Sequence, residues 1–422
     1  MCMLVSCRGV LWLEKSINLR FVGVKMKHYD IVVIGCGGLG SAACYWSARA
    51  GASVLGIEQF ALGHHRGGSQ DHSRIIRLAQ HEPAYAALAP HAYDAWQTLE
   101  ADADLGTAHQ VLHKTGGLVI EDVAVRDSAK TGKRNIAGYQ EALTAQGVDF
   151  EVLNADEVMA RWPQFRLAGS EKAVYQKDSG LVDAARGNAL HVAMARAHGA
   201  DFWQETPVLS VRPQGDGVVV ETPDATVSAG RAIVASGAWS NAVLCDVGIN
   251  LPLTVTQEQV TFYATRYVRD FAPSRFPVFM WHGAHNFYGF PAYGEVATKL
   301  GQHMGGHEVT AETRDFQADP VRQQRYRDFL EQHIPGFVGP ELYTKTCLYT
   351  IPPDQHFVLD AVPGAEQVIT AIGAGHAYKF ASLIGRILSE LATDGSSHYP
   401  TTTFRFDRPA LTDPNFAKAF HA

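Results

Sequence analysis

The chain has 422 residues, of which 46% are hydrophobic and 19% are charged, and these are ordinary values for a globular enzyme. This length exceeds that of a typical single core and predicts two domains. The formal net charge of −7 argues against a nucleic-acid or anionic-membrane partner, because either would call for a basic excess.

The first 27 residues contain short apolar runs that are interrupted by Arg8, Glu14 and Arg20. None of these runs is long enough to span a bilayer, and no small-residue cleavage site follows one, so neither a membrane anchor nor a signal peptide is expected. We expect residues 1–27 to form a flexible extension, or translation to start at Met26.

Six cysteines are scattered along the chain without paired spacing, which predicts free thiols in a reducing compartment and hence a cytoplasmic protein. Two histidine pairs, His109 with His113 and His303 with His307, have the i, i+4 spacing of helical metal ligands. Neither pair carries the glutamate of the H-E-x-x-H motif, so we expect no metal site.

The first folded elements form a βαβ unit. Residues 29–34 contain the apolar run IVVI of a buried parallel strand, 41–50 have a helical pattern that ends at Gly51, and 53–58 form a second strand. The turn between the first strand and the helix reads GCGGLG at 35–40 and matches G-x-G-x-x-G.

Each residue of this fingerprint has a physical role. Gly35 permits the tight turn, Gly37 lets the backbone approach a pyrophosphate, and Gly40 allows close packing of helix on strand. The helix N-terminus favours phosphate, and Glu58 ends the second strand where a carboxylate can bind a ribose hydroxyl. The fingerprint predicts nucleotide binding but does not separate NAD from FAD.

Later segments alternate between helical and extended patterns. We expect helices over 84–99 (with a kink or break at Pro90), 136–146, 155–162, 184–199, 321–333 and 380–391, and strands over 115–121, 206–211, 218–222, 231–235 and 368–371. Alternating, antiparallel-looking strands fill 254–299. Because the segments that would hold one cofactor are far apart in the chain, the two domains are expected to be interleaved.

Three segments carry a resemblance to a known family. They are SRIIR at 73–77; FYGFP at 287–291 continuing to KLGQH at 299–303; and KTCLYT at 345–350 continuing to GAGHAYKF at 373–380. In this order they resemble monomeric sarcosine oxidase and N-methyltryptophan oxidase, over about residues 28–410.

The resemblance implies an α/β fold in which a Rossmann-like FAD-binding domain is interleaved with an antiparallel-sheet substrate domain. We expect FAD-binding parts at 28–115, 175–245 and 345–422 and substrate parts at 116–174 and 246–344. It also implies a cofactor-binding set completed by Ser73, Val208, Gly237 and Gly375.

The family attaches its flavin covalently through a cysteine, and Cys347 matches that position. Nearby cations would lower the pKa of this thiol and favour the thiolate nucleophile. If the segment is a strand, Lys345, Cys347 and Tyr349 share one face. By the same resemblance, Arg74 lies near the flavin ring and stabilises its reduced, anionic form.

Substrate and oxygen roles also follow from the resemblance. Arg77 and Lys379 are expected to hold the substrate carboxylate, because a guanidinium can donate two parallel hydrogen bonds to a carboxylate. Lys379 is expected to contact the cofactor as well. Lys299 is expected to activate oxygen, since a fixed cation stabilises developing superoxide charge. His303 would lie beside the substrate amine, with Tyr288 and Tyr349 along the cavity.

One departure stands out before the SRIIR segment. The family usually has a histidine-rich S-H-H-G stretch there, whereas this chain has Gln70 where a flavin-facing histidine is expected. His72 could substitute for that histidine if the loop shifts.

The sequence thus predicts a monomeric FAD-dependent oxidase of a small secondary amino acid, with oxygen as the second substrate. Three alternatives remain open. One is a same-fold oxidase of another amine, such as N-methyltryptophan, pipecolate, saccharopine or a fructosyl amino acid; another is a dehydrogenase that passes electrons to a protein or quinone; the third is a non-catalytic NAD-binding domain.

Overall fold

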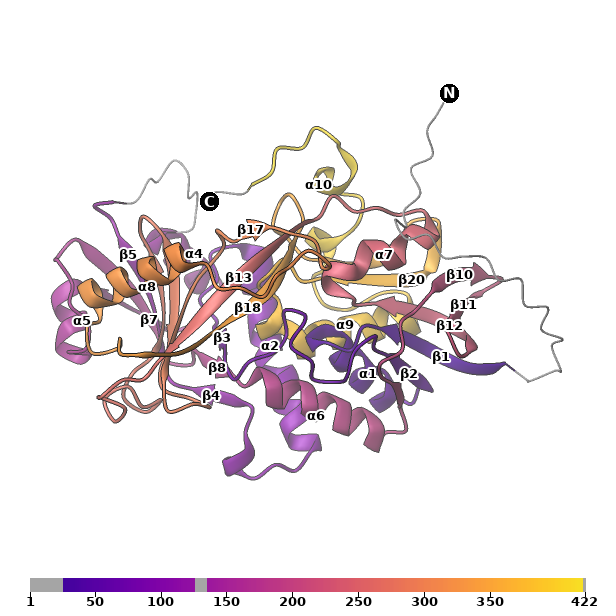
Figure 1. The fold of residues 1–422 in the computed structure, drawn as a ribbon, viewed down its shortest axis with the longest axis horizontal. Helices are drawn as coiled ribbons and strands as arrows, with labels where there is room; N and C mark the ends of the chain where they lie inside the picture. The colour runs from indigo at the N-terminus through magenta and orange to yellow at the C-terminus, as the bar shows by residue number, and fades with distance from the viewer. Residues whose placement is uncertain (1–25, 126–134, 420–422) are drawn as a thin grey trace.

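The computed structural model describes residues 26–125 and 135–419, which form two halves built on different sheets (Figure 1). The expectation for the first 25 residues lies outside this part of the chain. The right half in Figure 1 contains an eight-stranded sheet and the left half a nine-stranded sheet. This mixed architecture confirms the predicted fold class.

The eight-stranded sheet is mostly parallel and follows the order β10-β11-β12-β1-β2-β9, with β20 paired to β12 and β19 paired to β20. Its strands are β1 (Lys27–Ile34), β2 (Val54–Ile57), β9 (Asp201–Trp203), β10 (Ser210–Gln214), β11 (Gly217–Glu221), β12 (Thr226–Val234), β19 (Val358–Val362) and β20 (Ala365–Ile372). Strand β1 runs parallel to both neighbours, β2 and β12, and β12 runs parallel to β20. Segments from the start, middle and end of the chain therefore meet in one sheet.

Four helices pack around this sheet: α1 (Gly38–Arg49), α2 (Pro83–Asp102), α6 (Ala184–Ala197) and α9 (Ala381–Asp394). Helix α1 packs against both α6 and α9, and its residues from Gly40 to Ala48 are buried. A helix that is buried on nearly every side belongs inside a layered core, which fits its many glycine, alanine and serine residues.

The nine-stranded sheet follows the order β17-β13-β16-β15-β14-β5-β7-β6, with β18 paired to β13. Its strands are β5 (Gly117–Asp122), β6 (Glu151–Asn154), β7 (Glu171–Gln176), β13 (Thr254–Tyr263), β14 (Val278–His282), β15 (Asn286–Phe290), β16 (Thr298–Gln302), β17 (His307–Glu308) and β18 (Glu341–Ile351). All its pairings are antiparallel except that of β5 with β14.

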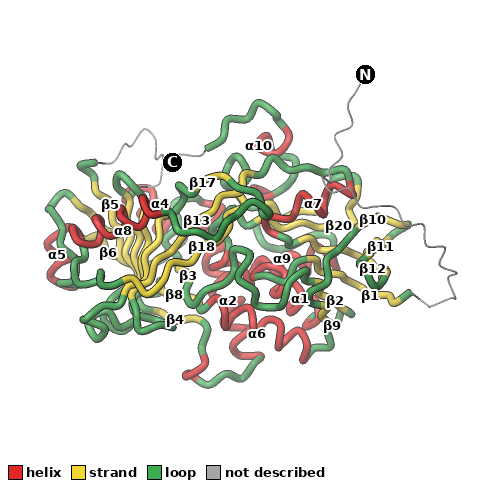
Figure 2. The backbone as a smooth tube through the Cα atoms, in the orientation of Figure 1, coloured by secondary structure: helices red, strands yellow, loops and turns green. Residues whose placement is uncertain are grey.

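The core under this sheet is rich in phenylalanine, with Phe271, Phe276, Phe279 and Phe337 packed edge to face. Helices α4 (Ile136–Ala145), α5 (Ala155–Arg161) and α8 (Pro320–His333) accompany it (Figure 2). Within residues 26–125 and 135–419, no helix is both long and apolar enough to cross a membrane.

A small third sheet carries functional residues into the junction of the two halves. It consists of β3 (Arg74–Ile76), β8 (Gly180–Val182) and β4 (Leu112–Lys114), all antiparallel. Strand β18 also bridges the halves, since it contacts the 3-10 turn η2 (Gly237–Trp239) that follows β12. The remaining short elements are η1 (Thr107–His109), α7 (Ser240–Leu244), η3 (Cys245–Val247), η4 (Tyr378–Phe380), η5 (Thr402–Phe404) and α10 (Pro409–Thr412).

Two sequence expectations differ from the structure. Helix α2 continues through Pro90, so the break that was one of the two expectations there is wrong. Buried side chains on both sides of the proline, including Leu88, Ala92 and Trp96, pack into the core, and their burial offsets the lost backbone hydrogen bond. Strand β10 begins at Ser210, so residues 206–209 precede it as irregular chain.

Candidate active site

A cavity of about 680 Å³ is lined by residues from both halves of the molecule. Most of the predicted site residues line it: Gly35, Gly37, Glu58, Arg74, Arg77, Val208, Gly237, Tyr288, His303, Cys347, Tyr349, Gly375 and Lys379. Gly40, Ser73 and Lys299 are buried but do not line it. The structure therefore brings together segments that are separated by up to about 340 positions in the chain.

The glycine fingerprint lies at one end of this cavity. Gly35 has a φ of +88°, which only glycine adopts readily, and a Cβ on Gly40 would lie 1.8 Å from the Gly35 carbonyl oxygen. Helix α1 begins beside the cavity without a side-chain cap and without an acidic residue in its first turn. Its first N–H groups are thus suited to a pyrophosphate, and the residues present fit the phosphate end of FAD.

Glu58 follows β2 and lines the cavity next to the fingerprint. Its carboxylate accepts hydrogen bonds from the backbone N–H groups of Cys36 (2.9 Å) and Phe60 (3.1 Å), and His64 Nε2 lies 3.5 Å away. Burial would raise the pKa of Glu58, but His64 and these N–H groups outweigh it and lower the pKa. The ionised carboxylate can accept a hydrogen bond from a ribose hydroxyl.

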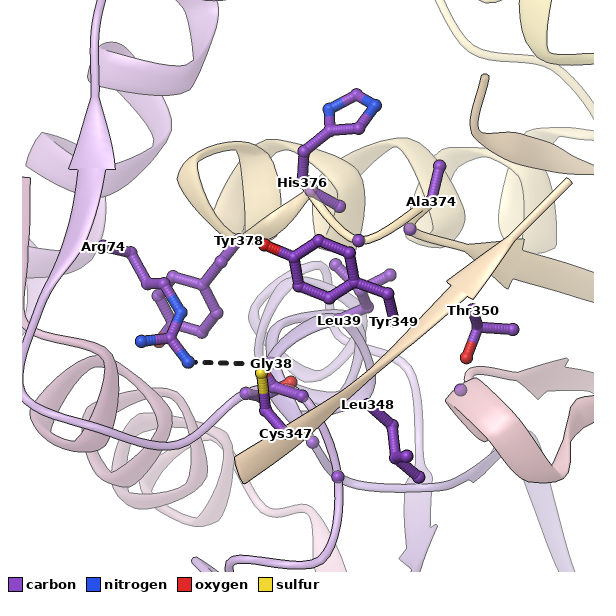
Figure 3. Close-up of a pocket in the computed structure, with 18 of the residues that line it drawn as sticks. Gly38, Leu39, Arg74, Cys347, Leu348, Tyr349, Thr350, Ala374, His376 and Tyr378 are labelled. Atoms are coloured by element: carbon purple, nitrogen blue, oxygen red, sulfur yellow. Dashed lines mark hydrogen bonds between the residues drawn. The ribbon is translucent and has the colours of Figure 1, made fainter. Parts of the chain in front are cut away.

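Cys347 lies on β18, and all six residues of this strand from Lys345 to Thr350 line the cavity. Figure 3 shows the Cys347 sulfur facing the guanidinium of Arg74. Burial raises the pKa of the Cys347 thiol, while Arg74 and Arg314 act in the opposite direction. The nearby cations thus act in the direction that the sequence predicts, but desolvation of the thiolate is the larger effect and the pKa is raised.

Arg74 is held by the loop that precedes it. Its guanidinium donates hydrogen bonds to the carbonyl oxygens of Ser73 (3.0 Å), Gly68 (3.3 Å) and Gln70, and lies 3.2 Å from Asp71 Oδ2. A guanidinium whose donors are bound in a fixed fork has little freedom to reorient. The positive charge of Arg74 is thus fixed at the wall of the cavity opposite Cys347.

Arg77 and Lys379 form a pair of cations at the cavity. Lys379 Nζ donates to the carbonyl oxygen of His376 at 2.6 Å, and Arg77 donates to the carbonyl oxygen of Ala79 and lies over the Tyr139 ring. Burial and the charge of Arg77 lower the pKa of Lys379 well below its usual value. In the described part of the chain, neither cation has a carboxylate within 4.0 Å, so this corner is suited to an anion.

Lys299 is the predicted oxygen-activating residue, and the structure gives it a partner that the sequence did not reveal. Lys299 Nζ lies 2.6 Å from Asp71 Oδ2 and donates to the Ser73 carbonyl (2.7 Å) and hydroxyl (3.1 Å) oxygens. Asp71 itself lines the cavity. The sequence gives no sign of this pair, because no periodicity links positions 71 and 299.

Gln70 and His72 occupy different surroundings. Gln70 lines the cavity where the family resemblance implied a histidine, whereas His72 Nε2 lies 3.2 Å from Glu295 and does not line the cavity. His72 is therefore engaged away from the cavity and does not take the place of Gln70.

Aromatic side chains form part of the cavity wall. The rings of His303 and Tyr349 have centroids 5.9 Å apart, and Tyr288 lines the cavity beside them. Burial raises the pKa values of Tyr288 and Tyr349, so both phenols stay neutral over the physiological range. This wall offers flat apolar surface with hydroxyl groups at its edge.

Comparison with known proteins agrees with this geometry. Residues 30–391 match the model of the DAO family, described as FAD dependent oxidoreductase. The chain belongs to this family. It is thus an FAD-dependent enzyme, and its relatives make it an amine or amino acid oxidase of the sarcosine oxidase group.

Two relatives illustrate the group. Monomeric sarcosine oxidase of Streptomyces avermitilis is 32% identical over 384 residues, covering 89% of this chain and 96% of the relative. N-methyl-L-tryptophan oxidase of Escherichia coli O9:H4 is 29% identical over 388 residues, covering 90% and 99%. The expected family is therefore confirmed.

Among solved structures, the open form of NikD, an unusual amino acid oxidase essential for nikkomycin biosynthesis, superimposes with a TM-score of 0.79 at 25% identity over 90% of this chain and 97% of NikD. Glycine oxidase of Geobacillus kaustophilus shares the fold, with a TM-score of 0.73 at 17% identity over 90% of this chain and 99% of that chain. The fold of this DAO-family member is thus the one that its flavoenzyme relatives use.

Proposed function

We propose that this DAO-family enzyme oxidises a small secondary amino acid of the N-methyl type, such as sarcosine, and passes the electrons to oxygen to form hydrogen peroxide. The imine product would hydrolyse to an aldehyde and an amine. The observation that carries the proposal is the pair of cations at the cavity, Arg77 and Lys379, without a carboxylate partner among the described residues.

The cation pair would bind the substrate carboxylate. The planar guanidinium of Arg77 would donate hydrogen bonds to it, and Lys379 would add a second charge from η4. A carboxylate bound at two charges has a defined orientation, which fixes the carbon next to the amine nitrogen. An amine without a carboxylate would lack this anchor.

The aromatic wall would hold the rest of the substrate. When bound, FAD would accept the two electrons of the C–H bond next to the nitrogen. The chain must therefore present that bond and keep the amine in its neutral form. His303, with Tyr288 and Tyr349 beside it, forms a polar edge on a largely aromatic wall, and this surrounding would favour the neutral amine.

Two further roles complete the proposal. Cys347 would hold the flavin covalently, as its place on β18 within the cavity allows. Lys299 and Arg74 would supply positive charge for the oxygen reaction, in which negative charge develops. A monomer of this chain contains all of these residues.

A second candidate substrate has a larger side chain. The cavity continues past Arg77 to Tyr139, Met280 and His282, which leaves lining surface that a molecule as small as sarcosine would not cover. An N-methyl amino acid with an aromatic side chain, such as N-methyltryptophan, could contact that surface. The side chain of the preferred substrate thus depends on the part of the cavity that Tyr139, Met280 and His282 line.

A panel of amines scored by peroxide release tests the function. Sarcosine, N-methyl amino acids with larger side chains, pipecolate, saccharopine and a fructosyl amino acid are supplied with oxygen. Peroxide from the N-methyl compounds supports the proposal. Flavin reduction without peroxide would indicate a dehydrogenase, and absence of flavin reduction by every secondary amino acid would refute the proposal.

A further inference from the structure

Asp71 is a buried carboxylate shared by two cations from different strands. Its Oδ2 lies 2.6 Å from Lys299 Nζ of β16 and 3.2 Å from Arg74 Nη1 of β3, and only 6% of the residue is exposed. Lys299 is 1% exposed. The three charges sum to +1, so the cluster remains positive although it contains an acid.

The backbone around Asp71 is shaped to place this carboxylate. Asp71 has a φ of +110°, which is uncommon for a residue other than glycine. Its Oδ1 accepts the backbone N–H of His72 at 2.7 Å, and its carbonyl oxygen accepts the N–H of Ala185, at the start of α6, at 2.9 Å. A conformation that is costly by itself persists where the surrounding contacts fix it.

The other groups that face the cluster are mostly uncharged. Lys299 Nζ lies 4.3 Å from the centre of the Phe290 ring of β15 and 5.7 Å from that of Phe262 of β13. The Cys347 thiol of β18 interacts electrostatically with all three charges, and Tyr343 of the same strand interacts with Asp71. Asp71 is therefore the carboxylate closest to Lys299 in the described part of the chain.

We propose that Asp71 is a positioning residue for the oxygen reaction: it keeps Lys299 protonated and holds Lys299 and Arg74 together as one net-positive cluster beside the cavity. This inference rests on the proposed function, in which that charge stabilises electrons as they pass to oxygen. Asp71 lines the cavity and Lys299 does not, so Asp71 also links the buried ammonium to the cavity wall.

The protonation states agree with this geometry. Burial lowers the pKa of Lys299 to about 8, although Asp71 acts to raise it. Burial would raise the pKa of Asp71, but Lys299 and Arg74 outweigh it and hold the pKa at about 2. Without the Asp71 charge, burial and Arg74 still favour the neutral amine, and the smaller influence of Cys347 opposes them.

Two variants remove the charge in different ways. Asp71→Asn keeps the shape and tolerates the positive φ, since asparagine is enriched there, and Asp71→Gly relieves the backbone altogether. Asp102→Asn is the matched control, because Asp102 also pairs with an arginine, Arg49 at 2.5 Å, but does not line the cavity.

The first measurement needs neither substrate nor oxygen. The holoenzyme is labelled with 13C at lysine Cε, and the Lys299 signal, assigned by its loss in Lys299→Met, is followed with pH by NMR. We expect a pKa near 8 in the wild type and the control, and a value lower by about one to three pH units in both Asp71 variants. An unchanged pKa in both variants would overturn the inference.

The second measurement follows reoxidation of the reduced flavin by oxygen as a function of pH. We expect the Asp71 variants to lose reoxidation rate at a lower pH than the wild type, with flavin reduction by substrate less affected. Equal losses in both half-reactions with an unshifted pH profile, or faster reoxidation at every pH, would contradict the inference. If the wild type itself does not react with oxygen, the proposed function fails while the NMR result still decides the role of Asp71.

Discussion

Gly40 of helix α1 packs so closely on Gly35 that a Cβ at position 40 would lie 1.8 Å from the Gly35 carbonyl oxygen and 2.9 Å from its carbonyl carbon. Backbone atoms cannot move aside as the end of a flexible side chain can. The contact therefore fixes how α1 leaves β1, and with it the direction of the first N–H groups of the helix. The spacing of the fingerprint is thus a packing requirement as well as a phosphate site.

Gly40→Ala should destabilise the fold and weaken FAD binding. Overpacking costs about 1–3 kcal/mol when neighbours can adjust, and a clash with backbone should lie at the upper end or beyond. Urea unfolding and the flavin content of purified protein measure the two effects. Gly106→Ala is the matched control, because nothing lies within 4 Å of its Cβ position; equal behaviour of the two variants would contradict the packing argument.

The flavin is expected to be attached at Cys347. After acid precipitation, the yellow colour of the wild type should stay with the protein pellet, whereas Cys347→Ser should fold and release its FAD into the supernatant. Cys245→Ser is the control, since Cys245 is a partly exposed thiol that does not line the cavity. Free flavin released entirely from the wild type would refute the attachment.

Attachment should also depend on pH. Burial raises the pKa of the Cys347 thiol, so the thiolate fraction increases as the pH rises towards that pKa. Apoprotein mixed with FAD should therefore form the covalent link faster at pH 9 than at pH 7. The yield of acid-stable flavin against time measures this, and a rate that falls with rising pH would contradict the thiolate requirement.

Arg77 and Lys379 are expected to recognise the substrate carboxylate. Removing one of these charges, as in Lys379→Met, should cost about 2–5 kcal/mol of binding for a carboxylate inhibitor, because the ligand charge is left buried with one partner. The same variant should bind the corresponding amide about as well as the wild type does. Lys172→Met, an exposed lysine on β7, serves as the control. Equal wild-type turnover of an N-methyl amino acid and its amide would exclude a carboxylate site.

Carboxylate binding should also take up a proton. The pKa of Lys379 in the free site is lowered by burial and by Arg77, and a bound carboxylate would raise it again. Between these two pKa values Lys379 is neutral when free and protonated when bound, so binding weakens as the pH rises from the lower pKa to the higher one. Calorimetry in buffers with different ionisation enthalpies counts the protons. If Lys379→Met still takes up a proton on binding, the proton goes to another group and this role of Lys379 is refuted.

The chain's own patterns predicted the βαβ unit well, because glycine spacing and apolar runs are local features with one structural meaning. The Asp71–Lys299 pair could not be found in this way, since two residues 228 positions apart share no periodicity and meet only through the packing of β16 against the loop before β3. The burial that raises the pKa of Cys347 could not be predicted for a related reason: burial is a property of the whole fold, whereas the neighbouring cations that lower this pKa can be guessed from sequence. The exact domain limits stay a prediction.

Lys299 is expected to serve the oxygen half-reaction. A fixed cation helps most where negative charge develops, and such charge appears as electrons pass to oxygen rather than as substrate binds. Lys299→Met removes the charge and keeps roughly the length of the side chain. We expect anaerobic flavin reduction by substrate to change modestly and reoxidation to slow by about 10²-fold, the size of one lost preorganised electrostatic contact.

The pH dependence gives this prediction a second check. Because the pKa of Lys299 is lowered to about 8, its positive charge is present below that pH and is lost as the pH rises through it. Wild-type reoxidation should therefore fall above about pH 8, and this fall should be absent in Lys299→Met. Stopped-flow absorbance measures the two half-reactions separately. If reoxidation is unaffected and only reduction slows, Lys299 serves the substrate or the fold, and Arg74, which also lines the cavity, becomes the cation to test next.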